Sequence, residues 1–137
     1  MLSGQRPDSF RFALIAAGIL GMTGVGIGAF GAHGLAATLA ERGMTHAFET
    51  GSRYHLFHAL AVLAAAAWLR TASGSAATRM LWAARFWTIG VVLFSGSLYW
   101  LALGGPRWLG PVTPLGGVAL LLGWLFVLLA AFEKRDE

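Results

Sequence analysis

Residues 18–34 constrain the fold more than any other stretch of this chain. They form an apolar segment that has no charged side chain and has a glycine at every second or third position. In water such a segment would make a poor helix, because each interior glycine costs roughly 0.5–1 kcal/mol relative to alanine. In a bilayer the helix is enforced, because no water is present to bond with an open backbone. We therefore predict a membrane-spanning helix here, and we expect it to be the central helix of a small bundle.

The composition of the whole chain is that of an integral membrane protein. Of its 137 residues, 57% are hydrophobic and 12% are charged, and the mean hydropathy is +0.67. A soluble domain carries about 25% charged residues, so this chain lacks the polar surface needed to face water on all sides. Its six Trp and nine Phe suit a protein that lies in lipid and at the lipid–water interface. The length fits one domain, residues 1–137.

The charge distribution argues against nucleic-acid binding, and the cysteine content excludes cysteine-based sites. The net charge is +4, but the basic residues are scattered at the ends of apolar segments and do not gather on one face. This pattern indicates membrane topology, so we expect the lipid bilayer and not a nucleic acid as a partner. The chain has no cysteine, which rules out disulfides and thiolate sites.

Apolar runs separated by polar or glycine-rich breaks predict four membrane-spanning helices. The predicted spans cover residues 12–32, 54–69, 81–103 and 115–132. Each approaches the ~20 residues needed to cross the hydrocarbon. The fold class is therefore an all-α integral membrane protein, a bundle of four transmembrane helices.

The ends of these helices carry capping signals. In the first connection, apolar spacing predicts a short interfacial helix that ends at Gly43. Thr45 is a candidate N-cap for a further helix that continues into the second span. Thr113 followed by Pro114 is typical of an N-cap with proline at the first helical position.

Small residues in the first span are expected to pack against other helices. Gly24, Gly28 and Ala32 lie four residues apart and so share a helix face, which lets a second backbone approach closely. The candidate packing residues are Gly21, Gly24, Gly28 and Gly31.

The distribution of basic residues predicts the orientation. With four spans, seven basic residues lie on the side of the termini, at positions 6, 11, 70, 79, 85, 134 and 135, and three lie opposite, at positions 42, 53 and 107. The positive-inside rule then places both termini in the cytoplasm, in a bacterial inner membrane or an equivalent membrane. Arg6 and Arg11 could also open a cleaved signal peptide, but the apolar run is longer than a usual signal core, so we favour a retained helix.

Histidines at the outer end of the bundle are the main candidates for ligand chemistry. His55 and His58 lie three residues apart on one helix, and His33 ends the first span at a similar depth. Three imidazoles could bind zinc, copper or haem iron. The pair lacks a neighbouring acid that could act as a catalytic base. The alternative, which we favour, is that these histidines bond to backbone carbonyls and to Tyr54 and close the outer end of the bundle.

The third span contains a second set of polar residues, Ser95, Ser97 and Tyr99. The serines could line a polar path, but serine in a transmembrane helix more often bonds its own helix or a neighbouring one. No Asp or Glu falls within any predicted span, which argues against a proton-coupled transporter. Arg85, flanked by Trp82 and Trp87, is expected to extend its charge to the headgroups.

Four motifs together resemble a known family. They are residues 28–35 (GAFGAHGL), 54–60 (YHLFHAL), 94–99 (FSGSLY) and 113–117 (TPLGG) with Gly123-Trp124. The chain resembles the family catalogued as domain of unknown function 423, which is related to the animal protein called transmembrane protein 256. The resemblance implies a four-span inner-membrane protein and implies no activity. It also suggests that the serine pair and three of the histidines, His33, His55 and His58, belong to the shared pattern.

These observations predict a non-enzymatic accessory or structural membrane protein, acting in a homo-oligomer or beside a larger complex, with no cofactor. One alternative is a binding protein whose outer histidines hold a metal, haem or quinone. A weaker alternative is a channel or carrier for a small solute along Ser95 and Ser97.

Overall fold

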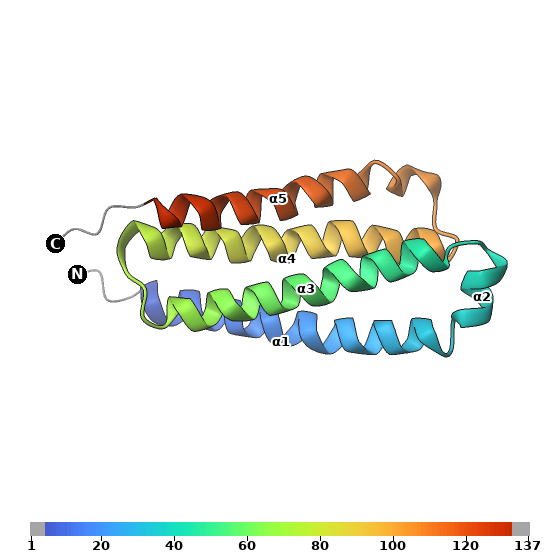
Figure 1. Cartoon of the computed structure of the whole chain (residues 1–137), viewed down its shortest axis with the longest axis horizontal. Helices are drawn as coiled ribbons and strands as arrows, with labels where there is room; N and C mark the ends of the chain where they lie inside the picture. The colour runs from blue at the N-terminus through green and yellow to red at the C-terminus, as the bar shows by residue number, and fades with distance from the viewer. Residues whose placement is uncertain (1–4, 133–137) are drawn as a thin grey trace.

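The computed structural model describes residues 5–132, with side chains from residue 8 onward. This part of the chain is helical throughout, apart from short connections (Figure 1). The elements are α1 (Gln5–Ala32), α2 (Ala36–Glu41), α3 (Thr45–Leu69), α4 (Gly74–Ala102), the 3-10 helix η1 (Arg107–Leu109) and α5 (Val112–Ala131). Of the basic residues that predict the orientation, the side chain of Arg6, together with Lys134 and Arg135, lies outside the described part.

The predicted spans match the ends of the long helices better than their starts. Each span ends within one residue of the observed helix end, whereas α1, α3, α4 and α5 begin between three and nine residues earlier than predicted. Hydropathy marks only the apolar part of a helix. The backbone bonds continue into the polar turns that precede it.

Two predicted caps are wrong. The N-cap of α3 is Met44, not Thr45, and α5 begins at Val112 after Pro111, two residues before the predicted Pro114. The short helix predicted in the first connection is present as α2. Gly43, which has a φ of 64°, lies in the turn that follows it. Thr113 fails as a cap because its hydroxyl bonds to another helix, α4.

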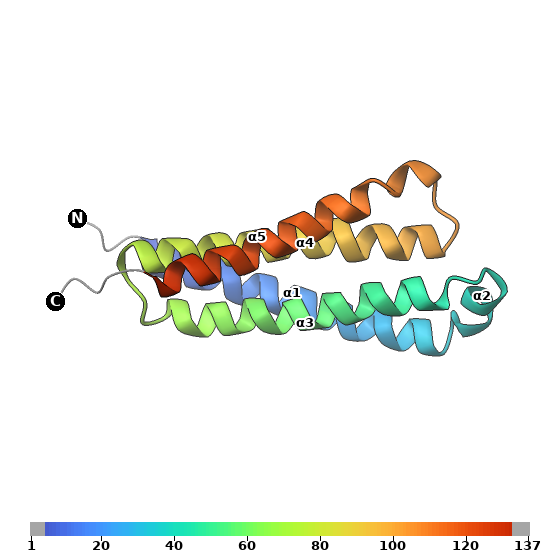
Figure 2. The same cartoon turned by 45° about the horizontal axis from the view of Figure 1, so that its top comes forward.

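The four long helices lie side by side, with α3 and α4 as the inner pair (Figures 1 and 2). α1 packs along α3 and touches α4 only slightly, whereas α5 packs along α4 and crosses it at an angle. The expectation that the glycine-rich helix would be central is therefore wrong. Its glycines pack against a single helix, because α3 covers one face of α1 and the opposite face carries large apolar side chains.

Glycines provide the closest helix contacts. A Cβ added at Gly24 would lie 2.8 Å from the Leu56 side chain, and one at Gly31 would lie 2.2 Å from Phe48, so both face α3. Gly28 faces Ser52 on the same helix, whereas Gly21 has open space where its Cβ would be.

The contact between α4 and α5 brings backbone against backbone. A Cβ at Gly116 would lie 2.3 Å from the backbone nitrogen of Phe94, so the two backbones themselves touch. Gly90 and Gly123 provide further close approaches, against Leu120 and Trp87. Only a residue without a side chain fits such positions.

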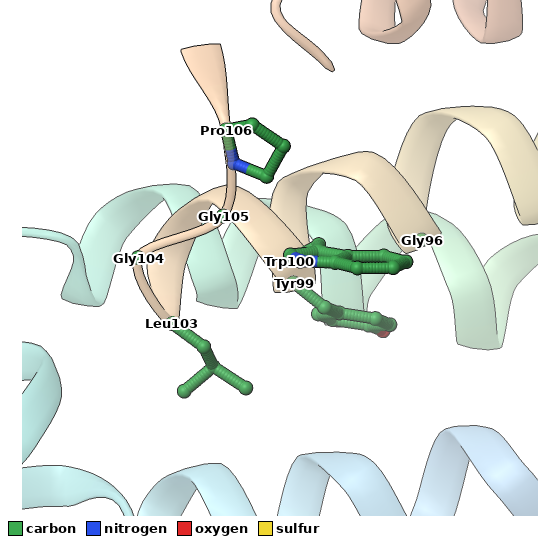
Figure 3. Close-up of a pocket in the computed structure, with 7 residues that line it drawn as sticks. All are labelled: Gly96, Tyr99, Trp100, Leu103, Gly104, Gly105 and Pro106. Atoms are coloured by element: carbon green, nitrogen blue, oxygen red, sulfur yellow. The ribbon is translucent and has the colours of Figure 1, made fainter. Parts of the chain in front are cut away.

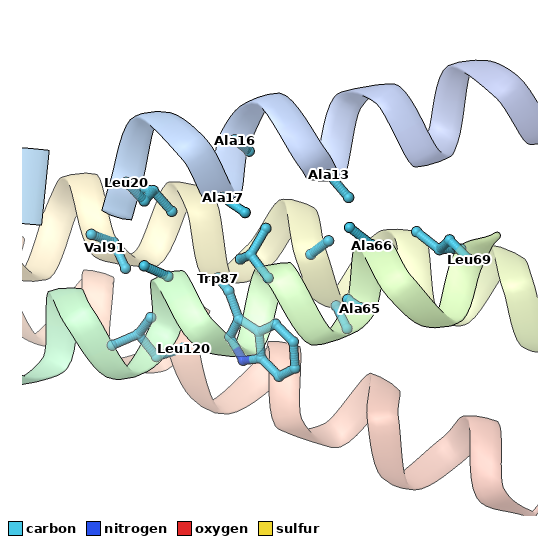
Figure 4. Packing of buried hydrophobic residues seen from close by; sticks show 14 residues of the cluster. Ala13, Ala16, Ala17, Leu20, Ala65, Ala66, Leu69, Trp87, Val91 and Leu120 are labelled. Atoms are coloured by element: carbon cyan, nitrogen blue, oxygen red, sulfur yellow. The ribbon is translucent and has the colours of Figure 1, made fainter. Parts of the chain in front are cut away.

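The main core contains many small residues. Figure 4 shows the alanines of α1 and α3 meeting near Trp87, Val91 and Leu120. Fourteen buried residues form this cluster, and eight of them are alanine (Ala13, Ala16, Ala17, Ala59, Ala65, Ala66, Ala83 and Ala84). Packing of small residues brings helix backbones together in a way that does not depend on water.

Three described helices are long and apolar enough to cross a membrane: Asp8–Ala32, Gly74–Ala102 and Arg107–Ala131, the last including η1. α3 is not among them, because its first half carries Glu49, Arg53, His55 and His58. Large apolar side chains point outward from all four long helices, and several, including Met22, Leu121 and Phe132, are at least 70% exposed. The outer surface is therefore suited to lipid.

Candidate functional site

The polar half of α3 carries two histidines that are both buried, at 4% and 6% exposure. His55 faces α1 and α4, and His58 faces α5. Three residues along a helix amount to about 300° of rotation, so the two rings can face different neighbours while lying close in height. The site is built from these two rings and their partners.

His55 links three helices through its ring nitrogens. Its Nδ1 lies 3.0 Å from the Tyr99 hydroxyl on α4, and its Nε2 lies 3.3 Å from the Thr23 hydroxyl on α1. Thr23 donates its own hydrogen to the carbonyl of Ile19 at 2.7 Å, so its oxygen accepts from Nε2–H. Nδ1 must then accept from Tyr99. A directed chain of hydrogen bonds therefore runs from α4 through α3 to α1.

His58 has the opposite tautomer. Its Nδ1 lies 2.8 Å from the backbone oxygen of Tyr54, and its Nε2 lies 3.2 Å from Nε1 of Trp124 on α5. An indole nitrogen can only donate and a carbonyl can only accept. His58 is therefore neutral, with its hydrogen on Nδ1.

An aromatic group surrounds His58. Trp87 and Trp124 have ring centroids 4.7 Å apart, and each lies about 6 Å from the imidazole. The Trp87 side chain is packed against Gly123, where a Cβ would lie 2.4 Å from its indole nitrogen. Within the described part of the chain, this nitrogen is the one buried side-chain nitrogen or oxygen that lacks a hydrogen-bond partner.

The structure does not bring His33 to the other two histidines. His33 is exposed after the end of α1, while both nitrogens of His55 and of His58 already have partners. Across residues 5–132, no three His, Cys, Asp or Glu side chains gather closely enough to hold a metal ion. Of the predicted outer cluster, Tyr54, His55 and His58 lie near one another, and Tyr54 takes part through its carbonyl and through its ring, which stacks on His58.

The two serines of α4 each connect two helices. Ser95 is fully buried and donates to the Gly51 carbonyl on α3 at 2.7 Å. Ser97 shares a 2.7 Å hydrogen bond with Thr113 on α5 and also donates to Phe94 in its own helix. Tyr99 bonds His55, and its ring lies 4.9 Å from that of Phe48.

Two open grooves lie on the surface of the helix bundle. One, of about 510 Å³, follows the end of α4 and is lined by Gly96, Tyr99, Trp100, Leu103, Gly104, Gly105 and Pro106 (Figure 3). The other, of about 650 Å³, lies between α3 and α5 and is lined by Arg53, Tyr54, Phe57, His58, Leu60, Ala61 and Trp124. We call the second the α3–α5 groove. Neither lining includes Ser95 or Ser97.

Comparison with known proteins identifies the family. The family described as "Protein of unknown function (DUF423)" matches residues 27–117. The chain belongs to this family. It is 43% identical over 127 residues to the UPF0382 inner membrane protein YgdD of Escherichia coli, covering 93% of this chain and 94% of that one. It is 38% identical over 120 residues to a UPF0382 membrane protein of Staphylococcus epidermidis, covering 88% and 94%. No solved structure matches the chain.

Sequence reasoning missed three partners in the site. Thr23 and the indole of Trp124 were not singled out, and Thr113 was predicted as an N-cap rather than as the partner of Ser97, although each of the three is bonded to a predicted residue. A signal existed for Thr23, because it is the only hydroxyl in an otherwise apolar run of glycines. For Trp124 the signal was weaker, since tryptophan is common in membrane helices for other reasons.

Proposed function

We propose that the chain crosses the membrane four times, with α3 as the span that hydropathy alone leaves out. α3 has 25 residues, about 37 Å of helix, which exceeds the ~30 Å of hydrocarbon. Its packing between α1 and α4 supports this, because its polar side chains are bonded inward to those neighbours. The name of the Escherichia coli relative supports an inner membrane, and the excess of arginines at positions 11, 70, 79 and 85 supports cytoplasmic termini.

Cysteine labelling tests this topology cleanly, because the chain has no native cysteine. Glu41→Cys lies before α3 and Ser73→Cys after it, and both positions are exposed. In spheroplasts, a membrane-impermeant maleimide should label Glu41→Cys directly and Ser73→Cys only after permeabilisation. Labelling of both from one side would mean that α3 does not cross the membrane.

We infer that the protein is a non-enzymatic accessory or structural component of a homo-oligomer or a larger membrane complex. This inference is supported by the hydrogen bonds of the buried polar side chains. His55, His58, Ser95 and Ser97 each hold one helix to another, which leaves none of them free for chemistry. The outward apolar faces of α1 and α5 leave room for a neighbouring protein in the membrane.

Native mass spectrometry tests this role on protein extracted at its natural expression level in mild detergent. Co-purifying subunits, or multiples of the 14.5 kDa chain, would support the proposal. A monomer that carries a metal or chromophore mass would contradict it. The geometry gives the histidine-held cofactor no support, because both rings are fully bonded, and it gives the solute path no support, because the two serines are enclosed.

A further inference from the structure

The α3–α5 groove is an apolar channel with a charge at one end. α3 and α5 make little direct contact, so the groove opens between them, over α4. Arg53, Phe57, Leu60 and Ala61 follow one another along one side of α3, over about 12 Å of helix. Phe57 and Leu60 are more than 60% exposed, and Trp124 is 50% exposed, so the groove opens sideways. In a membrane that opening faces the acyl chains.

The charged end of the groove has a cation with no partner of its own. Within residues 8–132, no hydrogen bond or ion pair engages the Arg53 guanidinium. Arg53 lies two turns from the start of α3, near the connection that carries α2, and its long side chain can extend from there to the depth of the lipid headgroups in a four-span arrangement. A guanidinium at this depth favours a phosphate, which it can bind through two parallel hydrogen bonds.

The His58 ring and the Trp124 indole, which also line the groove, are not available to a neutral headgroup. The His58 ring and the Trp124 indole are bonded to each other, and the second His58 nitrogen is bonded to the Tyr54 carbonyl. A quinone would need such donors for its carbonyls. Among the lining residues, the donors without a hydrogen-bond partner are the Arg53 guanidinium, at the charged end, and the Tyr54 hydroxyl.

We propose that the α3–α5 groove is a binding site for one anionic phospholipid of the leaflet opposite the termini. The Arg53 guanidinium binds the phosphate, and one acyl chain lies along Phe57, Leu60 and Ala61 toward Trp124. The charge selects the headgroup, and the apolar lining holds the chain. This inference rests on the four-span arrangement proposed above.

Native mass spectrometry of the full chain in detergent, with added lipid, tests the site. Phosphatidylglycerol and phosphatidylcholine with identical acyl chains are compared. We expect one phosphatidylglycerol per chain, held about tenfold more tightly than phosphatidylcholine, a ratio that corresponds to about 1.4 kcal/mol. Arg53→Gln should remove this preference and Arg53→Lys should retain part of it. Arg107→Gln is the charge control, because Arg107 lies at the same end of the molecule but outside the groove.

A second pair of variants tests the acyl-chain part without changing charge. Ala61→Phe fills the groove and should weaken phosphatidylglycerol binding about tenfold. Ala64→Phe places the same ring at an exposed position outside the lining and should leave binding unchanged. Helix content by circular dichroism establishes that each variant is folded.

Three outcomes would overturn the proposal: equal retention of the two lipids by the unmodified protein, unchanged selectivity in Arg53→Gln, or a co-purified neutral quinone that Ala61→Phe displaces. The labelling test separates this failure from failure of the topology. If α3 does not cross the membrane, both cysteines are labelled from one side, whatever lipid the protein binds. If the labelling shows four spans but lipid selectivity is absent, only the proposed lipid site is wrong.

Discussion

His58 and Trp124 fix each other. The indole has only a donor and the Tyr54 carbonyl has only acceptors, so a single neutral form of His58 satisfies both partners. His55 is held in the other form by Thr23 and Tyr99. The two histidines, three residues apart, therefore have opposite tautomers and bond to different helices. His58 bonds to α5, and His55 bonds to α1 and α4.

Loss of the indole donor should destabilise the protein. In Trp124→Phe, the buried Nε2 of His58 has no donor, which we expect to cost about 0.5–1.5 kcal/mol and to lower the midpoint of thermal unfolding in detergent. Trp108→Phe is the control, because Trp108 is 69% exposed and its indole has no bonded partner among the described residues. Equal melting of the two variants would contradict the assigned bond.

The two tautomers are directly observable. In protein labelled with ¹⁵N at histidine, His55 should be protonated on Nε2 and His58 on Nδ1, and the nitrogen chemical shifts distinguish these forms. Tyr99→Phe should change the signals of His55 and leave those of His58 unchanged, because Tyr99 bonds only the first ring. Two rings with the same tautomer would be incompatible with the bonding described.

At the scale of elements, the contact between α4 and α5 depends on glycine. Gly116 meets the backbone of Phe94, whereas the next residue, Gly117, has only ordinary contacts, since a Cβ added there would lie 3.8 Å from its nearest neighbour, the Phe94 ring. Backbone atoms cannot rotate away as a side chain can. The two adjacent glycines therefore should respond differently to the same small change.

Gly116→Ala should destabilise the protein by about 1–3 kcal/mol through overpacking, and Gly117→Ala should be neutral or slightly stabilising. Thermal unfolding of both variants, followed by helix signal in one detergent, measures the difference. If Gly116→Ala melts with the unmodified protein, the two helices are further apart than described.

The sequence was enough to predict the helices, because apolar length and glycine breaks are local signals. It predicted the C-terminal ends of the four long helices to within one residue. It placed α1 centrally, however, because a glycine-rich face does not show how many neighbouring helices it contacts. Ser95 and Ser97 were expected to bond helices. Their partners, Gly51 and Thr113, lie 44 and 16 residues away, and no local pattern specifies such pairs.

The candidate site was harder to predict for the same reason. The motif around His55 and His58 indicated buried or ligating rings, but the choice depends on what faces each nitrogen. Thr23 and Trp124 decide it, and they lie 32 and 66 residues from their histidines. His33 shares a motif of its own with neighbouring glycines, yet the fold leaves it outside the group.

The whole molecule consists of two helix pairs, α1 with α3 and α4 with α5, joined along α3 and α4. The connection between α3 and α4, residues 70–73, is short and exposed for most of its length. A chain divided there should still assemble, because the contacts between the pairs do not depend on this connection.

Co-expressed fragments 1–72 and 73–137 should therefore co-purify from membranes through a tag on either one. Gly51→Leu in the first fragment should prevent this, since a Cβ at Gly51 already lies 3.1 Å from Tyr99 and 3.2 Å from Leu98. Gly26→Leu, where nothing lies within 4 Å, is the matched control. Fragments that separate without any substitution would show that the joint between the pairs needs the covalent connection.

The polar half of α3 has a consequence for biogenesis. A segment with this many costly side chains enters lipid poorly by itself. In the four-span arrangement proposed above, the order of helices along the chain favours insertion, because α1 is synthesised first and presents Thr23 and its glycine face before α3 is made. In this arrangement we expect the order of synthesis to contribute to folding, and a rearranged chain that begins at α3 should meet the translocon without the helix that shields it.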